Sequence, residues 1–287
     1  YSPDSAHAVY AAIRNGGCFL VRDGREGLPY DSVDNITFSP DGRHLAYSAR
    51  IGNNWFIMLD DQPGRTYGYV AAPTFSADSA HFAHVALDGD KFRVILDGKP
   101  GAAFEKVRAP VFSGDGRHLA YPVQKDGKWY MVLDEVVGES AFDSVDIPVM
   151  NADGSVLAFK ATLGDRSVLV VNGKAALVTA DIRTPIVSPQ GSFVAAETME
   201  DNKKWSIFLN GDATPVFDAV SNLTLSADGK HFSVAARSGK EWMVISDMKI
   251  GPILQKVCPA PFRYEPDGTL SSIVVWNGKL MRMIIRL

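Results

Sequence analysis

Cysteine is scarce in this sequence, with two residues among 287. Two thiols cannot build the disulfide framework of a small secreted scaffold. Apolar runs are short, and none reaches the roughly 18–20 residues that cross a bilayer, so we expect no membrane insertion. Neither sign of charge dominates, because 29 basic side chains stand against 33 acidic ones. A nucleic-acid surface needs an excess of lysine and arginine, so we also expect no nucleic-acid partner.

Motifs of catalysis and cofactor binding are absent as well. The chain has no Gly-x-Ser-x-Gly elbow, no His-Glu-x-x-His motif, no Cys-x-x-Cys pair, no phosphate loop and no Gly-x-Gly-x-x-Gly turn. We therefore predict a protein that is not an enzyme, with no catalytic residue, no metal site and no cofactor. Helical periodicity is missing too, since every long stretch is broken by glycine or proline, and almost no helix is expected.

A repeat is the main feature that the sequence does have. Its clearest copies are Phe38–Tyr47 and Phe112–Tyr121, which differ only at the residue before the aspartate. With that aspartate as the anchor, the copies fall at Asp4, Asp41, Asp78, Asp115, Asp153, Gln190, Asp228 and Asp267. The anchors are 37 to 39 residues apart. A period this constant predicts eight repeats in a single domain, residues 1–287.

Each repeat is interpreted as four short antiparallel strands. In the second repeat a strand at 36–38 precedes the Ser-Pro-Asp-Gly turn, and a second strand follows at 45–49. A tight turn leads to a third strand at 55–59, and Tyr67 marks the fourth. Radial repetition of such units is the architecture of a β-propeller. We predict an all-β fold, a single β-propeller with eight four-stranded blades, with a β-solenoid or sandwich array as the alternative.

Small residues support the propeller. They recur five positions after the anchor: Ala46, Ala83, Ala120, Ala158, Ala195, Ser233 and Ser272. Small side chains there let neighbouring blades pack closely. The tryptophans that open several third strands recur with the same period, which indicates packing between blades rather than a carbohydrate or base platform.

The ends of the chain complete the expected architecture. The last repeat stops after its third strand at Leu287, so the last blade is predicted to lack its fourth strand. We expect the ring to close between the two chain ends, with residues upstream of Tyr1 supplying that strand.

The Phe-Ser-Pro-Asp-Gly-x-x-Leu-Ala-Tyr string resembles the WD-repeat-like propeller repeat of TolB-like proteins, and the resemblance covers essentially the whole chain. It implies a propeller that serves as a binding platform, scaffold or non-catalytic domain. It also implies a periplasmic or secreted location.

Five of the six histidines occupy one repeat position, three residues after the anchor. Residues at one repeat position are spread around the fold and cannot converge on one metal ion, so these histidines are interpreted as structural. The anchor aspartates are interpreted as turn residues. Cys18 and Cys258 are expected to be small, buried or half-buried residues that form no disulfide.

Candidate binding residues come from a position seven residues before the anchor, which varies in charge. It holds Asp34, Arg108, Asp146 and Arg183 in four of the repeats. We placed it on the loop between the fourth strand and the next first strand, where propellers bind ligands. Arg108 and Arg183 are the predicted partners of a ligand carboxylate. An ordinary solvated rim of mixed charge is the alternative.

Arg263 is the fifth candidate. With Glu265 it precedes the irregular anchor Asp267, and a local salt bridge at ring closure explains this pair most simply, with a ligand site as the alternative. The predicted function is a non-enzymatic platform for a protein or peptide partner, in a chain expected to be monomeric. A hydrolase or lyase that uses carboxylates such as Asp34 and Asp146, or a purely structural domain, remain the alternatives.

Overall fold

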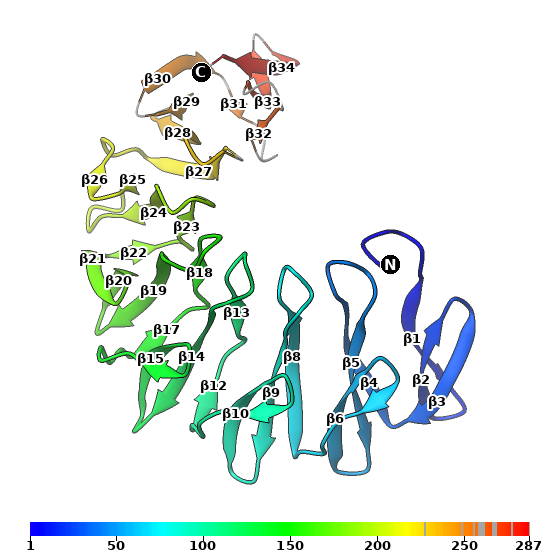
Figure 1. The fold of residues 1–287 in the computed structure, drawn as a ribbon. Coiled ribbons are helices and arrows are strands. Elements are labelled where there is room, and N and C mark those ends of the chain that lie inside the picture. Colours follow the sequence, from blue (N-terminus) through cyan, green and yellow to red (C-terminus); the bar gives the residue numbers. More distant parts are fainter. Residues whose placement is uncertain are drawn as a thin grey trace. The chain divides into compact units, whose positions relative to one another are not determined.

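A computed structural model shows a chain built from antiparallel β-sheets (Figure 1). It describes residues 1–226, 228–247, 249–254, 256–257, 262–265, 269–276 and 278–286. The predicted anchor Asp267, Cys258 and Leu287 lie outside these residues. The described part of the chain consists of strands and turns without helix, which confirms the predicted all-β propeller class. No helix of bilayer-spanning length and apolarity occurs in those ranges.

Two compact units divide the chain, Tyr1–Pro148 and Val149–Leu287. The described residues form eight sheets, and we refer to them in chain order as repeats one to eight. The single domain over residues 1–287 stays a prediction.

The first unit holds the first four sheets. Their strands are β1 (Val9–Arg14), β2 (Gly17–Arg22) and β3 (Arg25–Tyr30); β4 (Ser32–Phe38), β5 (Leu45–Ile51), β6 (Asn54–Leu59) and β7 (Gln62–Pro63); β8 (Tyr69–Phe75), β9 (Phe82–Asp88), β10 (Lys91–Leu96) and β11 (Lys99–Pro100); β12 (Lys106–Val107), β13 (Val111–Phe112), β14 (Leu119–Lys125), β15 (Lys128–Leu133) and β16 (Val136–Val137). The short strand β17 (Ser144–Val145) ends the unit.

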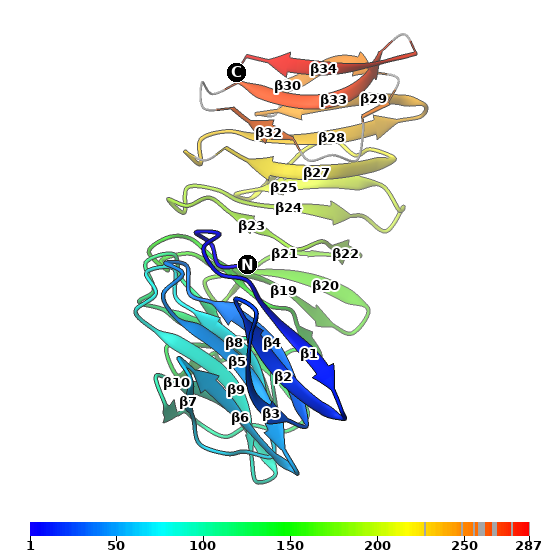
Figure 2. The same cartoon turned by 90° about the vertical axis from the view of Figure 1, so that its right-hand side faces the viewer.

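The second unit holds the other four sheets. Their strands are β18 (Val149–Met150), β19 (Leu157–Leu163), β20 (Arg166–Val171) and β21 (Lys174–Thr179); β22 (Asp181–Ile182), β23 (Ile186–Val187), β24 (Val194–Met199), β25 (Trp205–Leu209) and β26 (Asp212–Ala213); β27 (Ala219–Leu225), β28 (Phe232–Ser238), β29 (Glu241–Ser246) and β30 (Lys249–Leu254); β31 (Lys256–Val257), β32 (Arg263–Tyr264), β33 (Leu270–Trp276) and β34 (Lys279–Ile285). Figure 2 shows β27 and β28 running side by side in the seventh sheet. In the described residues the last sheet holds β31, β32, β33 and β34, and the missing fourth strand of the last blade stays a prediction.

The fourth strand of most repeats is shorter than a regular strand. In the second repeat β7 pairs with β6 over two residues, and the ladder resumes at a single bridge between Trp55 and Tyr67. The same bridge joins the predicted aromatic marker to the start of the third strand in three more repeats: Phe92 with Phe104, Trp129 with Phe142, and Trp205 with Phe217. The aromatic residues therefore do mark the outer strand.

The Ser-Pro-Asp-Gly turn closes itself with side-chain hydrogen bonds. The Ser39 hydroxyl donates to Asp41 Oδ1 at 2.6 Å and accepts from the His44 backbone N–H at 2.9 Å. Asp41 Oδ1 also accepts from the Arg43 backbone N–H at 3.0 Å. These bonds lower the pKa of the Asp41 carboxyl, the Ser39 bond most of all. The aspartate is thus a turn residue, as its repeat position predicts.

The turns of neighbouring repeats also touch. In the second unit, the Ala152 N–H of the fifth repeat donates to the Pro189 carbonyl of the sixth at 2.9 Å. Gly191 of the sixth repeat has a φ of +73° and lies against Asn151, the fifth repeat's equivalent of Ser39. A β-carbon at Gly191 would stand 2.7 Å from Asn151 Nδ2. Glycine is therefore needed at this turn for its conformation and for the close approach of the next repeat.

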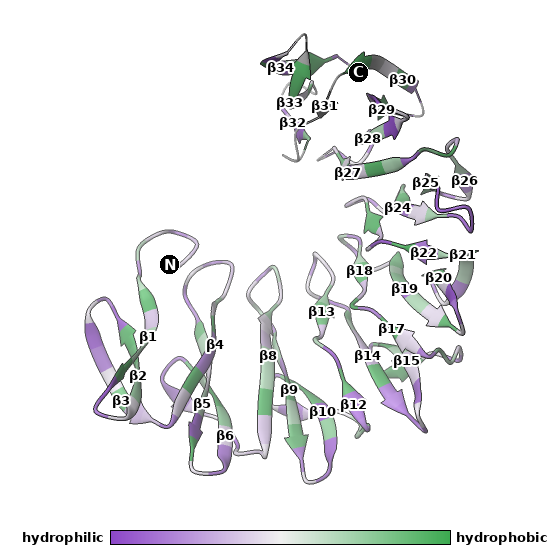
Figure 3. Ribbon diagram, turned by 180° about the vertical axis from the view of Figure 1, so that it is seen from behind, coloured by the Kyte–Doolittle hydropathy of each residue, from purple (hydrophilic) through white to green (hydrophobic). Residues whose placement is uncertain are grey.

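The core lies between successive sheets. Ala46 is fully buried and packs with Ile57 of its own repeat and Phe82 and Ile95 of the next. The equivalent Ala83, Ala120, Ala158, Ala195 and Ser233 are also fully buried, as expected if a small side chain lets two sheets approach. Figure 3 shows hydrophobic segments along the strands. Burial of these apolar faces is the main force that holds each repeat on its neighbour.

Candidate binding site

Asp34 lies at a bulge within the first strand of its repeat, not on the loop before it. The other three residues from this repeat position lie between two short strands of their repeats: Arg108, Asp146 and Arg183. Asp34 lies within β4, opposite Ser48 of β5. The register of this pairing shifts between Asp34 and Thr37, and Asn35 has a φ of 52°. The loop assignment was wrong because the first strand begins before these residues. A bulge unpairs the backbone and turns side chains to a new direction, so the position can vary without disturbing the ladder.

Arg108 and Asp146 come together. Arg108 Nη1 lies 3.2 Å from Asp146 Oδ1, and Nη2 donates to the Ser144 hydroxyl at 3.2 Å. The guanidinium also stacks 4.6 Å above the ring of Trp129, where the negative face of the indole favours a cation. The Arg108 side chain is 35% exposed and that of Asp146 54%. The Arg108–Asp146 pair therefore joins two segments of the first unit and stays accessible to solvent.

Arg183 is bound more tightly within its own unit. Its guanidinium pairs with Glu197, donates to the Val220 carbonyl at 3.0 Å, and lies 4.2 Å above the Trp205 ring. The Glu197 side chain is only 7% exposed. Arg183 thus neutralises a buried carboxylate and ties the sixth repeat to the seventh.

Asp34 and Arg263 are separate from these pairs. The Ser32 hydroxyl donates to the exposed Asp34 carboxylate at 2.6 Å. Arg263 is 79% exposed, with Nε 4.0 Å from Glu265. Glu265 also accepts from the Ser271 hydroxyl and from Arg282, each at 2.6 Å, and these contacts lower the pKa of its carboxyl, the Ser271 bond most strongly. The predicted local ion pair is confirmed.

Glu197 and Lys160 are charged residues that our sequence reasoning missed. Both lie seven residues after their anchor, where other repeats carry small or apolar residues such as Val85. Lys160 Nζ lies 2.6 Å from Asp181 of the sixth repeat. Burial acts to raise the pKa of Asp181, but the hydrogen bonds from Lys160 and the Ile182 N–H hold it below its usual range. The sequence did contain a signal for these two residues, namely a charged side chain at a repeat position that is small or apolar in the other repeats.

The histidines of the repeat are structural. His118 Nδ1 lies 2.6 Å from Asp134 Oδ2, whose other oxygen accepts from the Leu119 N–H at 2.9 Å. The same pairing occurs at His7, His44, His81 and His231. The fifth and sixth repeats have no histidine there, and their third strands end in Asn172 and Asn210 instead of aspartate. Among the described residues no cluster of three potential ligands could hold a metal ion.

His84 differs from the other histidines. It is 8% exposed, and burial lowers the pKa of its imidazole to about 4. It packs against the rings of Tyr67 and Phe82, and its Nδ1 has no hydrogen-bond partner among the described residues. His84 is therefore a neutral core residue, at a position where other repeats carry tyrosine.

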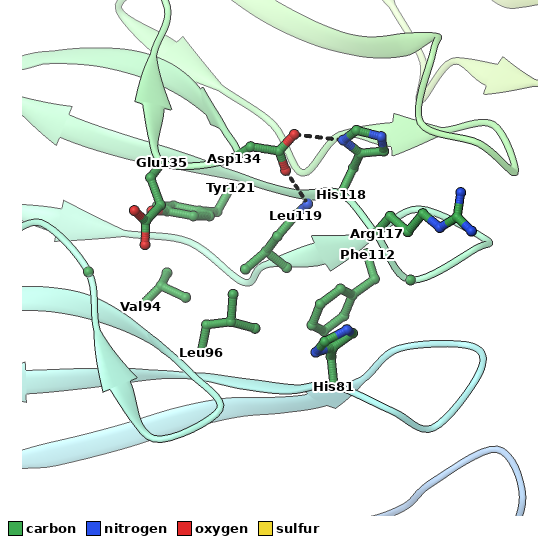
Figure 4. Close-up of a pocket in the computed structure, with 12 residues that line it drawn as sticks. His81, Val94, Leu96, Phe112, Arg117, His118, Leu119, Tyr121, Asp134 and Glu135 are labelled. Carbon is green, nitrogen blue, oxygen red and sulfur yellow. Dashed lines mark hydrogen bonds and ion pairs between the residues drawn. The ribbon is translucent and has the colours of Figure 1, made fainter.

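A cavity of about 270 Å³ opens between the third and fourth repeats (Figure 4). Val94 and Leu96 form one side, and Leu119 and Tyr121 face them. Burial raises the pKa of the Tyr121 hydroxyl to about 12. His81 stacks on Phe112 beside the opening, with ring centroids 6.4 Å apart. This cavity is an apolar gap between two sheets, and none of the predicted binding residues lines it.

No family model and no curated protein matches the chain. Solved structures are similar to it at low sequence identity. TolB from Acinetobacter baumannii is 12% identical, with 87% of this chain and 81% of that chain covered and a TM-score of 0.40. The propeller domain of Cps50 (Swd1) from Myceliophteria thermophila is 13% identical, with 97% of this chain and 100% of that chain covered and a TM-score of 0.39. The propeller domain of the trilobed protease from Pyrococcus furiosus is 11% identical, with 88% of this chain and 91% of that chain covered and a TM-score of 0.42. TolB and WD-type propellers are thus among its structural neighbours.

Proposed function

We propose that the protein is a non-enzymatic scaffold that binds a protein or peptide partner, and that the Arg108–Asp146 pair is the centre of this contact. The observation that carries the proposal is a cation and an anion side by side in the first unit, both accessible to solvent and both between short strands. A structural ion pair gains little at such exposure, which leaves room for a role in binding.

The pair suits an extended peptide. Asp146 can accept from a peptide N–H, and Arg108 can donate to a peptide carbonyl or to an acidic side chain. Trp129 holds the guanidinium in one orientation, so less side-chain entropy is lost when a ligand binds. Asp34 would extend the contact along the first unit. Arg183 and Arg263 remain candidates in the second unit, although Arg183 already forms an ion pair with Glu197.

The enzymatic alternative has less support. Two carboxylates that hydrolyse a glycoside need a separation of about 5–10 Å and one raised pKa. Asp34 belongs to the second repeat and Asp146 to the fifth, and Asp146 is bound by Arg108. Shifted carboxyl pKa values, such as those of Asp41, Asp181 and Glu265, lie below their usual range, the reverse of what a general acid requires.

A displayed library of random heptapeptides tests the proposal. We expect selection on the wild-type protein to enrich peptides, and we expect these peptides to bind the Arg108→Glu variant at least tenfold more weakly. Arg117→Glu is the matched control, because Arg117 is 81% exposed on a turn of the same repeat, and it should bind as the wild type does. A library that yields no peptide, or peptides that bind the Arg108 variant equally well, would refute the proposal and leave a purely structural domain.

A further inference from the structure

A second cavity of the first unit lies between its first two repeats, and it is separate from the Arg108–Asp146 pair. It measures about 720 Å³, against about 270 Å³ for the equivalent cavity between the third and fourth repeats. Its apolar wall includes Leu20, Tyr30, Tyr47 and Met58, all nearly buried. Ligand sites for small molecules commonly have volumes of about 300–1,000 Å³ with a mainly apolar lining.

One substitution within the repeat sets this cavity apart. Arg22, at the end of the third strand, occupies a position that is apolar in the next five repeats: Leu59, Leu96, Leu133, Val171 and Leu209. In the smaller cavity of Figure 4, Leu96 fills that position. The side chain of Arg22 lines the larger cavity, half-buried, and it makes no hydrogen bond or ion pair with any described residue.

Most of the other charged groups at the cavity have hydrogen-bonded partners. Arg25 also lines it without a partner in the described part of the chain. Asp23 is bound by His7 at 2.7 Å and by the Ala8 N–H at 2.9 Å, and Glu26 is bound by Arg14 at 2.6 Å. The remaining carboxylate is Asp61. Two guanidinium groups thus remain without a hydrogen-bonded partner among the described residues, beside an apolar wall. The Asp23 carboxylate is the charge next to Arg22, and its pKa is lowered by the Ala8 N–H first and also by the charge of Arg22.

We propose that this Arg22 cavity binds a carboxylate attached to an apolar body. A guanidinium matches a carboxylate with two parallel hydrogen bonds, and Arg22 and Arg25 supply that charge at the opening. The rings of Tyr30 and Tyr47 lie edge to face with centroids 6.3 Å apart, and they offer an aromatic or aliphatic body a surface on which to pack. The ligand is a small apolar acid or the C-terminal carboxylate of a peptide that ends in an apolar residue.

Titration calorimetry with 3-phenylpropionate tests this site. We expect saturable binding by the wild type, and at least tenfold weaker binding of the neutral 3-phenylpropanamide and of acetate, which lacks the apolar body. A tetrapeptide ending in phenylalanine, with a free or an amidated C-terminus, distinguishes the two sources of the carboxylate. Tighter binding of the free-acid peptide assigns the site to a chain end, and tighter binding of 3-phenylpropionate assigns it to a free acid. Binding of the amides as tightly as the acids, or no binding of any acid, overturns the proposal.

Arg22→Leu is the decisive variant because leucine is the residue of four other repeats at this position. It should lose at least tenfold in affinity while its melting temperature stays at or above that of the wild type. The matched control, Arg43→Leu, removes the same charge from a turn residue that is 84% exposed, and it should bind as the wild type does. Equal affinity in Arg22→Leu and wild type would show that the arginine has no part in binding. The Arg108 variants leave this cavity intact, so the two proposals can fail separately.

Discussion

Gly191→Ala should destabilise the protein considerably more than Gly173→Ala. Both glycines have left-handed backbones, with φ of +73° and +76°. Alanine in that conformation costs about 1 kcal/mol or slightly more, and both variants carry this cost. At Gly173 an added β-carbon meets no atom within 4 Å, whereas at Gly191 it would lie 2.7 Å from Asn151 Nδ2 and 2.9 Å from Val156 Cγ2. The difference between the variants therefore measures the contact between two successive turns.

The size of that difference follows from what Asn151 holds in place. Asn151 is 2% exposed, and its Oδ1 accepts from the Val156 N–H at 2.9 Å while its Nδ2 donates to Asp153 at 2.7 Å. Overpacking a site of this kind costs about 1–3 kcal/mol, and loss of the Val156 hydrogen bond costs about 1 kcal/mol more. We expect about 1 kcal/mol of destabilisation for Gly173→Ala and about 3–5 kcal/mol for Gly191→Ala.

Urea unfolding followed by tryptophan fluorescence and by circular dichroism measures both values. A double variant completes the test, because Asn151→Ala removes the amide that the new β-carbon would strike. The combined cost of Asn151→Ala and Gly191→Ala should then fall short of the sum of the single costs. Equal destabilisation by Gly191→Ala and Gly173→Ala, or strict additivity in the double variant, would refute the idea that the turns of neighbouring repeats support one another.

Two further predictions concern the same turns. His118→Val should cost up to about 1 kcal/mol of stability, because it removes one partner of a half-exposed pair. Adding Asp134→Asn should restore part of the loss, since the fifth repeat carries that combination naturally as Val156 and Asn172. Urea midpoints of the single and double variants measure this, and no recovery in the double variant would contradict it. Acid should also destabilise the fold. Hydrogen bonds to the carboxylates of Asp41, Asp115 and Asp228, those from serine first, lower their folded pKa below the usual aspartate value of about 3.9. The stability that these bonds contribute is present above that value and disappears as pH falls through the folded pKa. The melting temperature should therefore fall steeply below about pH 4, and equal values at pH 6 and pH 2.5 would contradict this assignment.

The sequence was most informative where one repeat determines its own structure. The Ser39–Asp41 turn closes through bonds within six residues, so its pattern is visible in each copy. Ala46 was predictable for a related reason: every repeat meets its neighbour in the same way, and the tolerated side-chain size recurs with the period. The aromatic residues that mark the fourth strand follow the same logic, since their bridge to the third strand recurs.

The partners of individual charges were not predictable in this way. Arg183 was identified as a candidate, but its pairing with Glu197 depends on the register between two strands, and the place of Asp34 depends on a bulge in β4. Neither is visible in the spacing of the anchors. The same bulge explains why Asp34 lies in a strand rather than in a loop. Asp146 illustrates the remaining difficulty, because its partner belongs to another repeat and no local pattern links them.

Departures from the repeat help to separate structural charges from binding charges. A charge at an apolar position between sheets loses solvation and must be compensated. Lys160 and Glu197 are compensated within the chain, by Asp181 and Arg183, and their role is complete without any ligand. Arg22 departs from the repeat in the same sense, yet it forms no hydrogen bond or ion pair with a described residue and acts only through its charge on the neighbouring Asp23. The cavity beside it is the larger of two equivalent ones. A compensating anion from outside the chain accounts for both of these differences.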